Sequence, residues 1–313
     1  MIIDAHYHLF EEKHWKSATT WEKPLIMAGY WRGVGDGLKQ FDPIKDLESN
    51  KEKIESLNIK PETVDELIER MNREKIDYTI CAGLCLQKQW DTYIPNEWIA
   101  EQVSKYPDRL LGFASVDPLG GKKSVYELRH CIKDLGMKGL KLATSYESIY
   151  PADPRIDIIY EECINLDIVV QNHTGWSLGG SMKHEDPLLY DEVGIKFPNL
   201  KYQLVHTGYQ SYYLAIMLML KHPNFWGDLA WWYTFPTSEL VRCIKLAKHY
   251  GVIDKLMYAS DNRATAPEIK RLKSLPKVSK ELNISPGLPD ITDKDINLIL
   301  GENAQKLYKI PDK

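Results

Sequence analysis

Short apolar runs alternate with amphipathic segments along most of this chain. Each run has the length and residue types of a buried strand, and the segments between them repeat apolar residues every three or four positions. Strands that alternate with helices of this kind form right-handed βαβ units and a parallel sheet. Eight such runs occur, at residues 2–8, 78–84, 110–116, 139–143, 168–172, 202–206, 225–230 and 256–260. They predict an α/β fold, namely a (β/α)8 barrel of the TIM type.

A doubly wound open sheet is the competing architecture. It is disfavoured because no Gly-x-Gly-x-x-Gly motif follows an early strand. The first amphipathic helix is predicted after Pro61, where Val64, Leu67, Ile68 and Met71 fall on one face. Further helices are expected at residues 96–106, 123–135, 155–166, 209–221, 238–250 and 293–308.

The longest interruption of this pattern follows the first strand, at roughly residues 9–60. It holds Trp15, Trp21 and Trp31 among several glycines and is too aromatic for a disordered linker. We expect a covering loop with short helices, one of them at 46–57. Because α/β barrels regularly reach this length as one unit, residues 1–313 are expected to form a single domain.

Composition limits the classes of partner. The formal net charge is −4 and 27% of residues are charged, which argues against nucleic acid as the main partner. No signal peptide is expected after Met1, and the longest apolar run, 212–220, is too short to span a bilayer. The five cysteines are scattered and odd in number, as in a cytoplasmic protein with reduced thiols. These features predict a cytoplasmic enzyme or binding protein without a membrane partner.

Polar residues end four of the predicted strands. The first strand ends in His6 and His8, the fifth in His173, the sixth in His206 and the eighth in Asp261. Residues that alternate along a strand share a face, so His6 and His8 point the same way. In a barrel the carboxyl ends of all strands meet on one face, where such enzymes place their chemistry. The five side chains are therefore expected to converge.

Three neutral imidazoles and one carboxylate suit a divalent ion. Zinc fits this donor set and keeps a position open for water or substrate, while manganese, iron and cobalt are alternatives. One group should stay outside the metal shell as acid or base, because proton transfer needs a residue that titrates near the working pH. His206 is the candidate.

Five short segments spread over nearly the full length of the chain match the motifs of one enzyme superfamily. They are 4–8 (Asp-Ala-His-Tyr-His), 172–175 (Asn-His-Thr-Gly), 205–208 (Val-His-Thr-Gly), 260–262 (Ser-Asp-Asn) and 301–304 (Gly-Glu-Asn-Ala). On these segments the chain resembles the amidohydrolase superfamily, and it is most similar to the amidohydrolase-related group that includes aminocarboxymuconate-semialdehyde decarboxylase, resorcylate decarboxylases and pyrone-dicarboxylate lactonase.

The resemblance implies a distorted barrel with one metal ion. His6, His8, His173 and Asp261 would be its ligands, and His206 would polarise water or substrate. It also makes a homo-oligomer an expectation, and the apolar helix at 214–220 could supply an interface. Two segments depart from the decarboxylases: 174–176 (Thr-Gly-Trp) replaces a proline, and 262–263 (Asn-Arg) replaces an aromatic residue and proline.

Substrate contacts are expected from four residues near strand ends. Lys141 lies on the fourth strand, where it could bind a substrate carboxylate, pack in the barrel or, carbamylated, bridge two metals. Arg263 is a candidate for an anionic group because a guanidinium pairs bidentately with a carboxylate, as is Arg32 in the insertion. Trp176 and Trp231 could wall a pocket for a planar or cyclic substrate.

The primary functional expectation is hydrolysis. A metal-activated water would attack a lactone or amide of a small cyclic or carboxylated substrate, with Asp261 taking its proton and His206 stabilising charge on the oxygen. The alternative is a non-oxidative decarboxylase that uses the same residues to protonate carbon. A non-catalytic barrel stapled by a metal is less favoured, since structural zinc sites are usually closed and rich in cysteine.

Overall fold

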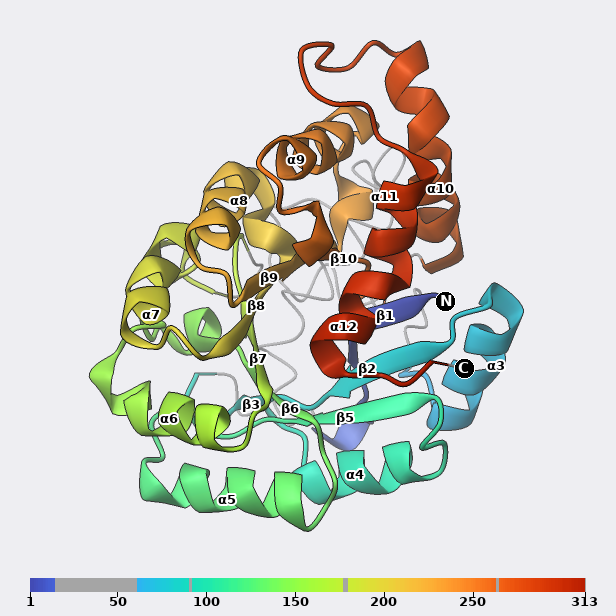
Figure 1. Cartoon of the computed structure of the whole chain (residues 1–313). Coiled ribbons are helices and arrows are strands. Elements are labelled where there is room, and N and C mark those ends of the chain that lie inside the picture. The colour runs from blue at the N-terminus through green and yellow to red at the C-terminus, as the bar shows by residue number, and fades with distance from the viewer. Residues whose placement is uncertain (15–60, 90–91, 177–179, 263–264, 313) are drawn as a thin grey trace, which may run out of the picture.

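The computed structural model describes residues 1–14, 61–89, 92–176, 180–262 and 265–312 (Figure 1). Most of the predicted aromatic insertion, with the helix expected at 46–57, lies outside the described residues. The arrangement of the whole chain as one domain therefore stays a prediction.

Eight parallel strands form the centre of the molecule (Figure 1). Every hydrogen-bonded pair of neighbours in this sheet is parallel. In spatial order the strands are β1 (Ile3–His8), β2 (Tyr78–Ala82), β5 (Leu110–Ala114), β6 (Gly139–Leu142), β7 (Val169–His173), β8 (Lys201–Val205), β9 (Phe225–Asp228) and β10 (Leu256–Met257). All eight were predicted from the sequence, and their order confirms the TIM-type barrel.

Backbone hydrogen bonds bring the first strand against the segment that follows β10. The Ala5 N–H donates to the Tyr258 carbonyl at 3.0 Å, and the Asp261 N–H donates to the His6 carbonyl at 2.9 Å. The open edges of the sheet thus meet and the barrel is nearly closed. Two predicted site residues, His6 and Asp261, are joined at this seam.

Helices cover the outside of the strands (Figure 1). They are α3 (Val64–Glu74), α4 (Asn96–Ser104), α5 (Lys122–Lys133), α6 (Asp157–Asn165), α7 (Asp191–Lys196), α8 (Tyr212–Lys221), α9 (Thr237–His249), α10 (Thr265–Glu281), α11 (Asp293–Asn297) and α12 (Asn303–Tyr308). The predicted apolar face of α3 is buried, and Thr63 caps the helix in a reciprocal pair with Glu66.

Three features differ from the sequence-based expectation. Helices α7 and α10 were not predicted, and α10 contains Pro276, a residue type that usually ends a helix. A small antiparallel pair, β3 (Cys85–Leu86) with β4 (Thr92–Tyr93), also follows β2. The predicted last helix is divided into α11 and α12 by a π-helical turn at Leu298–Glu302.

A bulge in β1 decides which way its side chains point. The pairing register with β2 shifts between Asp4 and Tyr7, so β1 carries one extra residue there. As a result Ala5 packs in the barrel interior, while Tyr7 packs in the outer layer against the helices. His6 and His8 face inward, opposite to Tyr7, as the alternation predicted.

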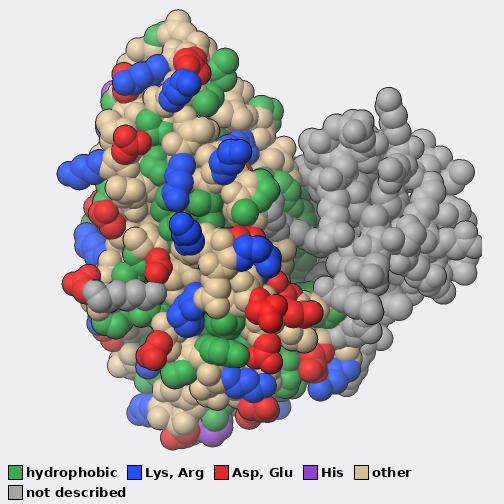
Figure 2. Space-filling model, turned by 90° about the vertical axis from the view of Figure 1, so that its right-hand side faces the viewer, with side chains coloured by type: hydrophobic (Ala, Val, Ile, Leu, Met, Phe, Trp, Pro, Cys, Tyr) green, Lys and Arg blue, Asp and Glu red, His purple; other side chains and the backbone are tan. Residues whose placement is uncertain are grey.

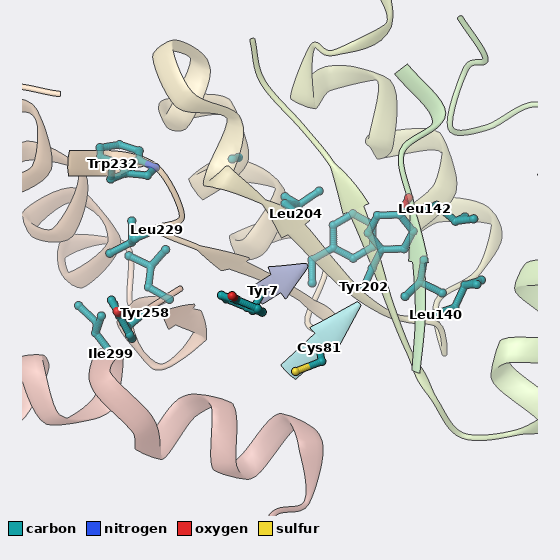
Figure 3. Packing of buried hydrophobic residues seen from close by; sticks show 14 of the residues in the cluster. Tyr7, Cys81, Leu140, Leu142, Tyr202, Leu204, Leu229, Trp232, Tyr258 and Ile299 are labelled. Carbon is teal, nitrogen blue, oxygen red and sulfur yellow. The ribbon is translucent and has the colours of Figure 1, made fainter. Parts of the chain in front are cut away.

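Two apolar layers support this arrangement. The larger lies between strands and helices, and Figure 3 shows Leu140 and Leu142 of β6 beside Tyr202 of β8 in it. The smaller fills the barrel and includes Phe113 together with Leu307 of α12. Helix α12 thus packs under the barrel, at the end away from the predicted site.

On the face in Figure 2, acidic and basic side chains are interspersed. No helix in the described part of the chain is long and apolar enough to cross a membrane. Helix α8 is apolar because it packs on the barrel: Ala215, Ile216, Leu218 and Met219 are all buried. An oligomer through this helix stays a prediction.

Candidate metal and catalytic site

Six side chains named from the sequence gather at the carboxyl end of the barrel. His6 and His8 lie on β1, Lys141 lies on β6, and His173 ends β7. The other two come just after strands: His206 follows β8 and Asp261 follows β10. The structure therefore brings residues from five strands into one buried region, as the strand-end pattern predicted.

His6, His8 and Asp261 form a tight donor group. One ligand atom from each lies within 4.8 Å of the others. The Nε2 atoms of His6 and His8 are 3.0 Å apart. Asp261 Oδ1 lies 3.9 Å from His6 Nε2 and 3.8 Å from His8 Nε2. Two nitrogens bound to one tetrahedral zinc lie about 3.3 Å apart, since each Zn–N bond is about 2.0–2.1 Å. The spacing and chemistry of this group fit a divalent ion.

Hydrogen bonds to the backbone fix the tautomers of two histidines. His8 Nδ1 is 3.1 Å from the Ala82 carbonyl, and His206 Nδ1 is 3.1 Å from the Ala230 carbonyl. A carbonyl only accepts, so each Nδ1 carries the proton and each Nε2 presents a lone pair. Burial, followed by the charge of Lys141, lowers the pKa of His8 to about 3. Its ring is held in the neutral form that binds metals.

His173 lies beside the tight donor group. Its ring packs edge-on against His206, with centroids 4.7 Å apart, and against Tyr146 at 5.0 Å. The ring hydrogen-bonds to the backbone of Gly175, and burial lowers its pKa well below the usual value. Its Nε2 is buried and has no hydrogen-bond partner among the described residues. An unsatisfied buried nitrogen at this place fits a fourth ligand.

Lys141 brings a cation into the same space. It is only 2% exposed, and its Nζ lies 3.1 Å from His6 Nε2. Burial lowers the pKa of Lys141 to about 8, although the carboxylates of Asp261 and Asp228 oppose the shift. An amine in this position can bind an anionic group that enters the site.

The backbone around the site is strained. His206, Thr207, Tyr209, Asp261 and Asn262 all have φ between 45° and 67°. Residues with a side chain avoid this region, at a cost of about 1–3 kcal/mol each, unless their surroundings hold them there. Gly175 (φ 79°) lies against this segment, where an added Cβ would be 2.5 Å from the Gly208 carbonyl carbon. Close backbone packing thus fixes the loops that carry His173 and His206.

A sequence profile of the amidohydrolase family matches residues 88–310. The chain belongs to the amidohydrolase family. It is 29% identical over 172 residues to a 2-amino-3-carboxymuconate-6-semialdehyde decarboxylase from Dictyostelium discoideum, covering 46% of this chain and 47% of that relative. The chain thus matches about half the length of that relative. These matches confirm the resemblance predicted from the sequence.

Solved structures show the same fold as this amidohydrolase. An uncharacterized TIM-barrel protein from Bordetella bronchiseptica has a TM-score of 0.69 at 17% identity, covering 99% of this chain and 98% of that one. A dihydroxybenzoic acid decarboxylase from a Polaromonas species, with bound manganese and 2-nitroresorcinol, has a TM-score of 0.62 at 18% identity, covering 100% of this chain and 98% of that one. A probable 2-pyrone-4,6-dicarboxylic acid hydrolase from Acinetobacter baumannii has a TM-score of 0.62 at 15% identity, covering 98% of this chain and 99% of that one.

The structure describes two further predicted substrate residues of this amidohydrolase, Trp231 and Trp176. Trp231 is half-buried, and its Nε1 donates to the Asp261 carbonyl at 3.2 Å, which puts it at the site. Trp176 is half-buried three residues after His173. Arg263 and Arg32 lie outside the described residues.

Sequence reasoning missed three residues at the site of this amidohydrolase. Asn262 holds the backbone of His8, accepting from its N–H at 2.9 Å and donating to its carbonyl at 2.6 Å. The Tyr209 ring stacks on His206 at 4.6 Å. Asp228 ends β9 and is fully buried. The strand-end argument, applied to this seventh strand of the barrel, would have found Asp228, whereas nothing in the sequence indicated the stacking of Tyr209.

Proposed function

We propose that this protein is a metal-dependent, non-oxidative decarboxylase of a small conjugated or aromatic carboxylate. The observation that carries the proposal is the donor group of His6, His8 and Asp261, whose ligand atoms lie within 4.8 Å. The decarboxylase name of the Dictyostelium relative supports this reaction over others. His173, whose Nε2 has no hydrogen-bond partner in the described part of the chain, is proposed as the fourth ligand.

Zinc is the proposed ion because three imidazoles and a carboxylate suit it, and manganese, iron and cobalt are the alternatives. When bound, a divalent ion polarises an oxygen of the substrate or lowers the pKa of water. The manganese in the Polaromonas decarboxylase makes that ion the first to compare.

The reaction needs a proton at one carbon. When the bond to the carboxyl group breaks and carbon dioxide leaves, the electron pair stays on that carbon and must be protonated. His206 Nε2 and Asp261 Oδ2 lie 3.9 Å apart, and these two groups are proposed to accept a proton from the bound substrate or from water and to deliver it to that carbon. We assign Lys141 to bind the anionic substrate, because its Nζ lies in the buried site beside His6. Trp231, Trp176 and Arg263 are proposed to line the pocket.

Hydrolysis is the second candidate, and one observation favours it. His206 Nε2 presents a lone pair, which can accept the proton of an attacking water. The same tautomer has no proton on Nε2 with which to stabilise an oxyanion, so the neutral ring does not suit the role expected for it from the sequence. In a hydrolase, His206 would act as the base.

One assay separates the two reactions. Protein purified without chelator is analysed for metal and incubated with a dihydroxybenzoate, 2-amino-3-carboxymuconate-6-semialdehyde and 2-pyrone-4,6-dicarboxylate. Carbon dioxide release from either of the first two supports the decarboxylase. Ring opening of the pyrone without carbon dioxide release supports the hydrolase. Turnover that persists fully in metal-free protein would contradict both, and full activity in His206→Gln would remove His206 from the mechanism.

Location and partners follow from the same chemistry. We propose a cytoplasmic protein, since all five cysteines are free and buried. Its partner is proposed to be a small anionic molecule rather than nucleic acid, in keeping with a net charge of −4.

A further inference from the structure

We propose that Asp228 is a positioning residue that fixes the tautomer and orientation of His206, and that Tyr308 of the last helix holds Asp228 in place through Gln203. The proposal builds on the role of His206 in the proposed function. It concerns three residues that form no part of the donor group, and it can be tested without turnover.

The Asp228 carboxylate accepts three hydrogen bonds inside the barrel wall. Oδ1 accepts from the backbone N–H of His206 and from that of Ala230, both at 3.0 Å, and Oδ2 accepts from Gln203 Nε2 at 2.7 Å. A carboxylate only accepts, so it matches three converging donors. An amide at this position would turn its own N–H groups toward at least one of them.

Two of these hydrogen bonds hold the two residues, His206 and Ala230, whose contact selects the tautomer of the His206 ring. His206 Nδ1 donates to the carbonyl of Ala230, and the same Asp228 oxygen holds the N–H of Ala230 and the N–H of His206. If these hydrogen bonds to Asp228 are lost, the Ala230 carbonyl and the His206 ring can separate. The ring proton can then move from Nδ1 to Nε2. The group facing Asp261 would then be a donor rather than an acceptor.

Strain explains why such a restraint is needed. His206 has φ of 67° and the β-branched Thr207 has φ of 47°. The Thr207 hydroxyl donates to the backbone carbonyl of Asp228 at 2.6 Å. Both the backbone and the side chain of Asp228 therefore hold the segment that carries His206 and Thr207. Without these bonds the segment is expected to relax toward ordinary backbone angles.

Tyr308 extends the network to the far end of the barrel. Its hydroxyl donates to Gln203 Oε1 and lies 3.2 Å from Gln171 Nε2, which donates to the Ala5 carbonyl at 2.8 Å. Because a carboxylate only accepts, Gln203 turns its Nε2 toward Asp228 and its Oε1 toward the Tyr308 hydroxyl, which holds the amide in this orientation. The hydrogen-bonded path therefore runs from Tyr308 through Gln203 and Asp228 to His206.

The test reads the His206 ring directly. Ring nitrogens are observed by NMR in protein labelled with ¹⁵N-histidine and loaded with its metal, and the His206 signals are assigned by their loss in His206→Gln. Wild type should show a protonated Nδ1 and an unprotonated Nε2. In Asp228→Asn, and to a smaller extent in Tyr308→Phe, the Nε2-protonated form should appear. The double variant should add little to Asp228→Asn, because both changes act on one path.

Tyr160→Phe is the matched control. It removes another buried phenol hydroxyl, which donates to the Pro151 carbonyl at 2.8 Å outside the barrel, and should leave the His206 signals unchanged. If turnover is found, Asp228→Asn should lower kcat at least about tenfold with little change in KM, since a positioned acid or base contributes about 10²–10⁴-fold. Asp228→Ala should lower kcat by at least the same factor as Asp228→Asn.

Unchanged His206 signals in folded Tyr308→Phe and Asp228→Asn would overturn the proposal. If Asp228→Asn fails to fold, Tyr308→Phe alone decides, since it removes one hydroxyl and keeps the ring. Altered tautomers in a protein with no decarboxylase or hydrolase activity would support this inference while contradicting the proposed function.

Discussion

Nζ of Lys141 lies 3.1 Å from Nε2 of His6, so a buried amine and a proposed metal ligand share one space. The two residues come from β6 and β1, which are not neighbours in the barrel wall. A cation bound by His6 would repel the Lys141 ammonium, whereas an anionic substrate would be attracted by both. This relation makes Lys141 the most informative residue for separating substrate binding from metal binding.

Lys141→Met should retain the metal and lose substrate affinity. Removing the ammonium removes a like charge beside the proposed ion and one partner for a substrate carboxylate. KM should rise about tenfold or more, because hydrogen bonds to charged groups contribute about 1.5–3 kcal/mol. Metal content by elemental analysis and KM under steady state check this. Loss of metal would instead favour the carbamylated, metal-bridging lysine.

His8→Ala should abolish metal binding while the barrel stays folded. The ring offers Nε2 to the donor group, and its removal leaves two of the three converging ligand atoms. His249, which is exposed at the end of α9, provides the control His249→Ala. Elemental analysis of both variants, with circular dichroism for the fold, measures the difference. Equal metal content in the two variants would contradict the ligand assignment.

Chelation should destabilise the wild-type protein and not His8→Ala. A ligand that binds only the folded state stabilises it by an amount that grows with its concentration, about 2.7 kcal/mol at one hundred times Kd. The melting temperature with and without chelator measures the effect. A melting temperature that chelator does not lower would argue against a metal bound to the folded barrel.

Gly175→Ala should be more destabilising than a change at an equally strained glycine. Gly175 has φ of 79°, and an added Cβ would be 2.5 Å from the carbonyl carbon of Gly208. Strain and overlap together should cost about 2–4 kcal/mol. Gly136→Ala is the control, because Gly136 has φ of 72° but nothing within 4 Å of the added atom, so only about 1–2 kcal/mol is expected. Equal losses on urea unfolding would show that the contact between the two loops is unimportant.

Asp295→Asn should lower stability at neutral pH. The carboxylate accepts from Thr292 N–H, Thr292 hydroxyl and Lys248 Nζ, each at 2.7 Å. Burial opposes ionisation of Asp295, but these partners outweigh it and lower the pKa below the ordinary 3.8. The stabilisation is therefore full above pH 3.8 and is lost as the pH falls through the lowered value. We expect a loss of about 1–3 kcal/mol at pH 7 and a smaller one in acid. A difference independent of pH would mean that the charge is unimportant.

Local sequence predicted most of the elements because each strand and helix has its own apolar periodicity. It failed where local and tertiary preferences conflict. Helix α10 contains Pro276 and still forms, with Ile269, Leu272 and Leu275 buried on one side of it, so tertiary packing overrides the local preference there. Residues 15–60 of the insertion and Arg263 lie outside the described residues, and their roles stay predictions.

The sequence alone determined the barrel and the strand ends at which His6, His8, His173, His206 and Asp261 lie, because strand order and side-chain alternation are readable along the chain. Only the tertiary structure decided how these residues act on one another. The bulge in β1, the carbonyls that select the tautomers of His8 and His206, and the burial of Lys141 each depend on atoms from different strands. Distances between such atoms are set by packing and closure of the barrel, which no local pattern in the sequence records.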